Sequence, residues 1–185
     1  TQRDETAERL RLLRSHGMTT LTLDRYQGRA ISYDVTTVGL NYRIDEIRSA
    51  LGRSQMERLT RNLELRREIY QTYVDLLAPR DEIMLPFLDR VEDEAGYHIF
   101  PIALPDSAGR DAFIQALKAE GIQTSIHYPP IHRFQAYQEY LAGRDVHCPL
   151  TESISARQVT LPFYPGMSSA DVRFVCEAVT RHARL

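Results

Sequence analysis

Two histidines, His127 and His132, flank the segment Tyr-Pro-Pro-Ile and could bind a metal or a polar ligand. Their spacing matches half of a zinc-finger pattern, but the sequence contains no Cys-x-x-Cys partner, so we expect no metal site. The double proline keeps the segment extended and prevents both histidines from lying on one helix face. Two interpretations remain: a loop that contacts a substrate, or a packed loop in which His127 hydrogen-bonds to backbone, as lone histidines more often do.

A second candidate site is the tripeptide Asn41-Tyr42-Arg43, which precedes a helix expected to start near Ile44. Free amides at a helix N-terminus, with an asparagine and an arginine beside them, suit a phosphate group. Asn41 could instead be a simple cap or turn residue. Arg43 could clamp a phosphate with two hydrogen bonds, or merely pair with Asp45 or Glu46 on the surface.

Lysine chemistry is restricted by composition, because Lys118 is the only lysine in the sequence. It lies in an amphipathic stretch, 112–119, on the polar face, where we expect a solvated surface side chain. Any reaction that needs a lysine amine must therefore use a lysine outside these residues. No glycine-rich phosphate loop, serine-histidine-aspartate spacing or paired-carboxylate motif stands out.

The elements that position these residues are predicted from periodicity. Apolar residues spaced by three, four and seven or eight predict a long helix from Ile44 to Leu77, whole or broken near Gly52, with Tyr70 and Tyr73 as core residues. The other predicted elements are a first helix closed by Gly17, strands at 97–104 and 122–128, helices at 112–119, 134–141 and 151–159, an extended stretch at 160–162, and a final helix capped by Ser168 or Ser169. This order indicates an α/β or α+β fold with few strands.

Several residues have no clear chemical role in the sequence. Arg25, Tyr26 and Arg29 fall in a long loop between the first helix and Gly39, and we interpret them as solvated. The remaining histidines are interpreted as structural, with His98 able to serve either purpose; they are His16, His98, His147 and His182.

Composition excludes several classes of protein. The 185 residues are 43% hydrophobic and 26% charged with a net charge of -2, which indicates a globular, soluble protein and no nucleic-acid partner. No apolar stretch approaches the roughly 20 residues of a membrane-spanning helix, and the polar N-terminus is unlike a signal peptide. Cys148 and Cys176 are too few and too far apart for a disulfide framework, so we expect a cytoplasmic protein.

Four collinear segments carry a resemblance that covers the chain from end to end. They are AERLRLLRSHGM at 7–18, VGLNYRIDEI at 38–47 with Ala50 and Gln55 after it, GIQTSIHYPPIH at 121–132, and LPFYPGM at 161–167. Each is similar to a signature of the DegT/DnrJ/StrS group of sugar aminotransferases, in that group's order and spacing.

The resemblance implies a fold-type-I aminotransferase that uses pyridoxal 5'-phosphate. It implies that residues 1–40 form the exit from a large cofactor domain and a loop at the interface. Residues 41–185 would comprise a long linking helix and a small C-terminal α/β domain. The chain would begin just past the Schiff-base lysine, so no catalytic residue is assigned within it. The implied substrate is a nucleotide-linked keto-sugar, with glutamate as the usual amino donor, in deoxyamino-sugar biosynthesis.

The resemblance also implies roles for single residues. Asn41 matches an asparagine that reaches across a homodimer to the neighbour's cofactor phosphate, and the loop with His127 and His132 would lie over the substrate's nucleotide-phosphate side. Together with Arg43, these histidines are the expected substrate-binding residues. Some relatives have lost the lysine and use the cofactor differently. Two alternatives stay open: a non-catalytic module that binds a nucleotide-sugar or a partner protein, and a split enzyme with the lysine on another chain.

Overall fold

The computed structural model describes residues 1–19, 34–88, 95–105, 109–141, 144 and 146–183. Contacts divide the chain into two units, Thr1–Glu57 and Arg58–Leu185, and each is described by itself. The division falls inside a helix and not at residue 40, so the assignment of 1–40 to a larger domain stays a prediction. Arg25, Tyr26 and Arg29 lie outside the described residues.

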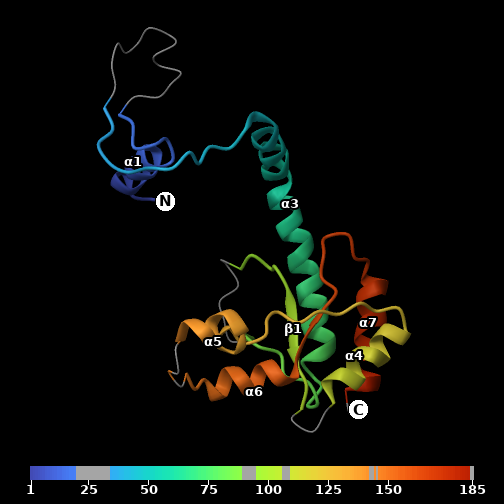
Figure 1. Cartoon of the computed structure of the whole chain (residues 1–185). Helices are drawn as coiled ribbons and strands as arrows, with labels where there is room; N and C mark the ends of the chain where they lie inside the picture. The colour runs from blue at the N-terminus through green and yellow to red at the C-terminus, as the bar shows by residue number, and fades with distance from the viewer. Residues whose placement is uncertain (20–33, 89–94, 106–108, 142–143, 145, 184–185) are drawn as a thin grey trace. The chain divides into compact units, whose positions relative to one another are not determined.

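Helices dominate the described residues, and two short strands complete them (Figure 1). No helix in the described ranges is both long and apolar enough to cross a membrane. The elements are α1 (Asp4–Leu13), α3 (Glu46–Leu77), β1 (Phe100–Ala103), α4 (Arg110–Ala119), the 3-10 helix η2 (Ile131–Arg133), α5 (Gln135–Leu141), α6 (Pro149–Arg157), β2 (Gln158–Leu161) and α7 (Ser169–His182).

Strands β1 and β2 pair antiparallel, with Phe100 opposite Leu161 and Ile102 opposite Val159. One isolated bridge flanks each strand: Met84 pairs with Ala103 of β1, and Ser125 pairs with Thr160 of β2. The strand predicted at 122–128 is therefore wrong, because only Ser125 in this segment pairs with the sheet. Helix α6 and strand β2 also differ from expectation, since Val159 lies in β2 and not in the preceding helix.

The core of the second unit forms where α3 meets the two strands. Tyr73 is fully buried, its ring stacks on Phe100 at 4.5 Å, and its hydroxyl donates to the Pro162 carbonyl at 2.9 Å. Leu77, at the end of α3, is also fully buried. The prediction of core residues on α3 is confirmed for Tyr73 and Leu77, whereas Tyr70 is only partly buried and packs against the core. Burial raises the pKa of the Tyr73 phenol above its usual range, so the group stays neutral and can donate.

Helices α4 and α7 lie side by side on this core (Figure 1). Helix α7 begins with a capping box, in which the Ser168 hydroxyl accepts from the Asp171 amide and the Asp171 carboxylate accepts from the Ser168 amide. The valines at 172, 175 and 179 are buried on one face, which confirms the helix and its cap. Hydrogen bonds from Ser168 hold the pKa of Asp171 below its ordinary value.

Helix α3 runs unbroken from Glu46 to Leu77, through Gly52. The Asp45 side chain accepts from the Arg48 amide at 2.8 Å and so caps its first turn. The helix ends two residues before Pro79, as predicted. Several apolar residues near its beginning are exposed, among them Ile47 at 84% and Met56 at 67%.

The core arrangement predicts the effect of Tyr73→Phe. The exchange leaves the Pro162 carbonyl without its buried donor, so we expect the free energy of unfolding to fall by about 1–3 kcal/mol. Urea unfolding followed by circular dichroism measures the change. Tyr137→Phe, which alters an exposed ring on α5, is the matched control and should leave the midpoint unchanged. Equal midpoints for Tyr73→Phe and the native protein would contradict the assigned hydrogen bond.

Candidate functional site

Asn41 and Arg43 belong to the first unit, where the chain after Gly39 is fastened to the end of α1. The Leu40 amide donates to the Leu13 carbonyl at 2.7 Å, and the His16 amide donates to the Leu40 carbonyl at 2.9 Å. The Tyr42 amide donates to the Arg14 carbonyl at 2.9 Å. These bonds on both sides of Asn41 fix the direction in which its side chain leaves the backbone.

Two glycines permit this close approach. Gly17 has a positive φ of 73°, and a Cβ there would meet the Thr37 carbonyl oxygen. A Cβ on Gly39 would meet the backbone nitrogen of Gly17 and the carbonyl carbon of His16. The sequence predicts that Gly17 closes α1. In the structure the helix ends at Leu13, and Gly17 turns the chain afterwards, with its amide on the Leu12 carbonyl at 2.9 Å.

The Arg43 Nε donates to the Asn41 side-chain oxygen at 2.9 Å, and both residues are exposed. Asp45 is occupied elsewhere: it caps α3 and pairs with Arg48 at 3.1 Å. Helix α3 begins at Glu46 and not near Ile44, and Asp45, not Asn41, caps its first turn. Arg43 donates to Asn41, so the alternative that it pairs with Asp45 or Glu46 is not observed among the described residues. Within the described residues Arg43 forms no ion pair. The Asn41 amide N–H groups and the terminal guanidinium N–H groups of Arg43 remain as adjacent donors.

His127 belongs to the second unit, where it follows the bridge at Ser125. Its amide donates to the Gln158 side-chain oxygen at 3.3 Å, and the Gln158 side chain donates to the Thr160 hydroxyl at 2.7 Å. The His127 ring packs edge-on against Tyr128, with centroids 4.9 Å apart. Its Nδ1 is buried and has no hydrogen-bond partner among the described residues. The backbone-bonded ring of the structural interpretation is therefore not observed.

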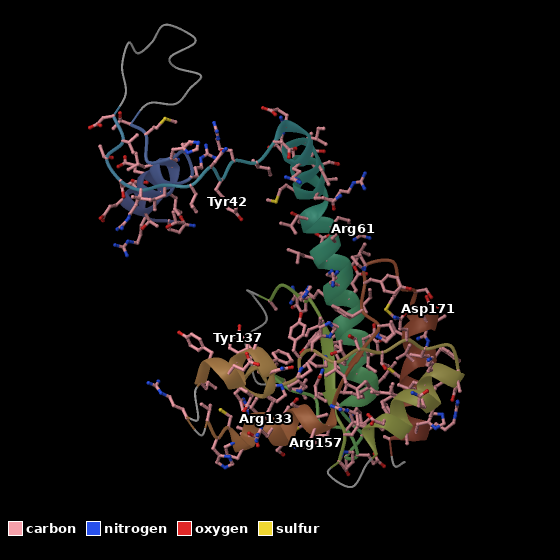
Figure 2. All side chains as sticks on the ribbon, viewed as in Figure 1. Tyr42, Arg61, Arg133, Tyr137, Arg157 and Asp171 are labelled. Carbon is pink, nitrogen blue, oxygen red and sulfur yellow. The ribbon has the colours of Figure 1, made fainter. Side chains whose placement is uncertain are left out.

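A cleft of about 660 Å³ opens beside His127. Its walls combine apolar and polar groups, among them Gln123, Ser125, Thr160, Phe163, Tyr164 and Asp171. Asp171 lies at the N-terminal end of α7 (Figure 2). His98, two residues before β1, lines the same cleft and is exposed. Gln158 and Thr160 carried no functional signal in the sequence, although their alternate positions on β2 place them on one face.

His132 lies elsewhere in the same unit. It lines a separate depression of about 560 Å³ with Tyr128, Tyr137 and Val146. Its Nε2 lies 2.8 Å from Glu152 of α6, and Arg133 binds the same carboxylate oxygen at 2.8 Å. The structure therefore places the two predicted histidines in different clefts. Glu152 carried no signal in the sequence, because its partners are nearly 20 residues away.

The remaining candidates have structural surroundings. His182 lies 2.6 Å from Glu120, which also binds Arg181 at 2.7 Å, so the structural interpretation of His182 is supported. Lys118 is exposed on α4, as predicted. Cys148 and Cys176 are free, and burial raises the pKa of the Cys176 thiol to about 12. Among the residues described, no group of three or more His, Cys, Asp or Glu side chains could hold a metal ion.

Comparisons with known proteins identify what the chain is similar to. The model of the DegT/DnrJ/EryC1/StrS aminotransferase family matches residues 1–180. The structure of DesV from S. venezuelae in complex with a ketimine intermediate has 29% identity and a TM-score of 0.81, over 100% of this chain and 46% of that chain.

Two further structures bear on the fold alone. Helicobacter pylori PseC, an aminotransferase involved in the biosynthesis of pseudoaminic acid, has 24% identity and a TM-score of 0.81, over 98% of this chain and 47% of that chain. The PLP form of Spr1654 from Streptococcus pneumoniae has 22% identity and a TM-score of 0.80, over 99% and 44%. The chain thus spans about half the length of these solved relatives.

The contact between residues 39–42 and α1 predicts the effect of Gly39→Ala. The added methyl meets backbone that cannot rotate away, so we expect a loss of about 1–3 kcal/mol in local stability. Hydrogen exchange of the Leu40 and Tyr42 amides should accelerate accordingly. Gly52→Ala is the matched control: nothing lies within 4 Å of a Cβ there, and a mid-helix alanine should stabilise α3 by about 0.5–1 kcal/mol. Unchanged exchange in Gly39→Ala would contradict the close packing.

Proposed function

Because the chain belongs to the DegT/DnrJ/EryC1/StrS aminotransferase family, we propose that the protein is a sugar aminotransferase that uses pyridoxal 5'-phosphate. The proposed reaction moves an amino group, with glutamate as donor, onto a nucleotide-linked keto-sugar in deoxyamino-sugar biosynthesis. The observation that carries the proposal is the family match over residues 1–180. The likeness to DesV, at 29% identity over the whole chain, supports it.

The donors on Asn41 and Arg43 fit anionic groups such as the phosphates of the cofactor and the substrate. Their exposed amide and guanidinium N–H groups lie next to each other, joined by the 2.9 Å bond between the two side chains. A guanidinium binds phosphate oxygens with two parallel hydrogen bonds, and no described carboxylate competes for it. We assign Asn41 to the cofactor phosphate and Arg43 to an anionic group of the substrate. Arg43 also orients Asn41, because its Nε holds the Asn41 oxygen.

The chemistry of transamination comes from the cofactor when it is bound, which acts as an electron sink. Residues of this chain would bind and orient the reactants. His127 borders a cleft of mixed polar and apolar lining, and His132 borders a largely apolar one. The sole lysine, Lys118, is exposed on α4, so no lysine-dependent proton transfer is assigned to these residues.

A homodimer is part of the proposal, with Asn41 serving the cofactor of the neighbouring subunit. The exposed apolar residues at the start of α3, such as Ile47, Leu51 and Met56, form a surface of the kind that interfaces cover. The two free cysteines are consistent with a cytoplasmic location.

A second candidate is a non-catalytic relative that binds a nucleotide-sugar or a partner protein. One experiment separates the two: the intact mass of the native polypeptide, with its visible absorption spectrum before and after borohydride reduction. We expect a visible band that reduction abolishes while fixing the cofactor to the polypeptide. A native protein with no band and no covalent label supports the non-catalytic candidate and contradicts the aminotransferase.

The assignment of Asn41 predicts the effect of Asn41→Ala. Loss of a hydrogen bond to a charged phosphate costs about 1.5–3 kcal/mol, so the dissociation constant for pyridoxal 5'-phosphate should rise roughly tenfold or more. Spectroscopic titration of the native protein after cofactor removal measures this. Arg53→Ala, at an exposed position of α3, is the control and should bind like the native protein. Equal affinities for Asn41→Ala and the control would remove Asn41 from the cofactor site.

A further inference from the structure

A single carboxylate oxygen connects η2 to α6. Glu152 Oε1 lies 2.8 Å from the His132 Nε2 and 2.8 Å from the terminal nitrogen of Arg133 (Figure 2 labels Arg133). The His132 side chain is only 11% exposed. The His132 carbonyl is also held, since it accepts from the Gln138 side chain at 2.5 Å. The ring and the backbone of His132 are thus both restrained.

The carboxylate determines which ring nitrogen carries the proton. The hydrogen bond from His132 is the largest cause that lowers the pKa of Glu152, and the bond from Arg133 adds to it, while desolvation opposes them. Glu152 is therefore ionised at neutral pH and can only accept, so the His132 Nε2 must donate. The lowered pKa also means that this contact stabilises the fold at neutral pH and is lost as pH falls through the folded-state value, below 4.5.

The other ring nitrogen remains free to act. No described residue forms a hydrogen bond with the His132 Nδ1. The ring borders the depression of about 560 Å³ lined mostly by apolar groups, where the other side chains with polar atoms include Thr151 and Cys148. With Nε2 committed to Glu152, Nδ1 is the atom that His132 can offer to a ligand in this depression.

We propose that Glu152 is a positioning residue for substrate binding, which fixes the tautomer and orientation of His132 so that its Nδ1 can meet the substrate. The inference rests on the proposed function, in which His132 contacts a nucleotide-linked sugar. Glu152 does not touch the substrate and acts only through His132. A carboxylate that holds one nitrogen of an imidazole commonly sets the function of the other.

The chain contains a matched control. Glu120 binds His182 at 2.6 Å and Arg181 at 2.7 Å, so its partners are a histidine and an arginine, as they are for Glu152. Its pKa is lowered by the same causes, with the His182 hydrogen bond first. This cluster joins the end of α4 to α7 and includes no proposed substrate residue. A merely structural role for Glu152 predicts that Glu152→Gln and Glu120→Gln behave alike.

The experiment introduces Glu152→Gln, Glu120→Gln, His132→Ala and the double variant His132→Ala/Glu152→Gln into the native protein. An amide can donate to Nε2 as well as accept from it, so Glu152→Gln should give a mixed His132 tautomer by 15N NMR. We expect its KM for the keto-sugar to rise about tenfold, with kcat changed less than twofold. Glu120→Gln should alter only the His182 resonances. In the His132→Ala background, Glu152→Gln should change KM less than twofold.

The outcomes separate this inference from the proposed function. A native protein without turnover contradicts the proposed function, and the inference is then decided by calorimetric binding of UDP and dTDP, which Glu152→Gln should weaken about tenfold. A His132 tautomer that does not change in Glu152→Gln overturns the inference. So does a KM, or a nucleotide affinity where turnover is absent, that stays within twofold of the native value. An equal effect of Glu152→Gln with and without His132 also overturns it.

Discussion

The buried phenol of Tyr73 is the contact on which the second unit depends. It joins three segments that are distant in sequence, because its ring stacks on Phe100 of β1 and its hydroxyl holds the carbonyl just after β2. Two strands of four residues each cannot form a stable sheet alone. The end of α3 supplies the missing apolar face, and α4 and α7 enclose the remainder. The packing of these elements therefore shapes the cleft beside β2 that His127 lines.

Side-chain hydrogen bonds restrain the candidate ligand-binding residues of this unit. Gln158 begins β2 and holds the backbone of His127, while Glu152, six residues earlier in α6, holds the ring of His132. Both hydrogen bonds come from the continuous segment of α6 and β2, yet the histidines that they hold line different clefts. In the first unit, Gly39 has the corresponding role for Asn41, since a close backbone contact replaces a side-chain bond.

The sequence allowed prediction of what depends on local periodicity and capping. Helix α3, with its buried Tyr73, and α7, with Ser168 as its cap, were both predictable for this reason. The segment 122–128 alternates like a strand, but only Ser125 pairs with β2, because alternation alone does not specify a pairing partner. Among the candidate ligand-binding residues, Asn41, Arg43 and the two histidines were singled out from residue types and from the family resemblance. Their partners Glu152 and Gln158 were not, because contacts over 20 to 30 residues leave no local pattern.

The isolation of Lys118 has a practical consequence. Within these residues, reagents that acylate amines meet one side chain, exposed on α4 and outside the clefts that contain His127 and His132. A dye or spin label attached there would report on the second unit without occupying a candidate binding surface. Labelling stoichiometry in the native protein would also count its accessible amines, and protection of one of them by the cofactor would identify it chemically.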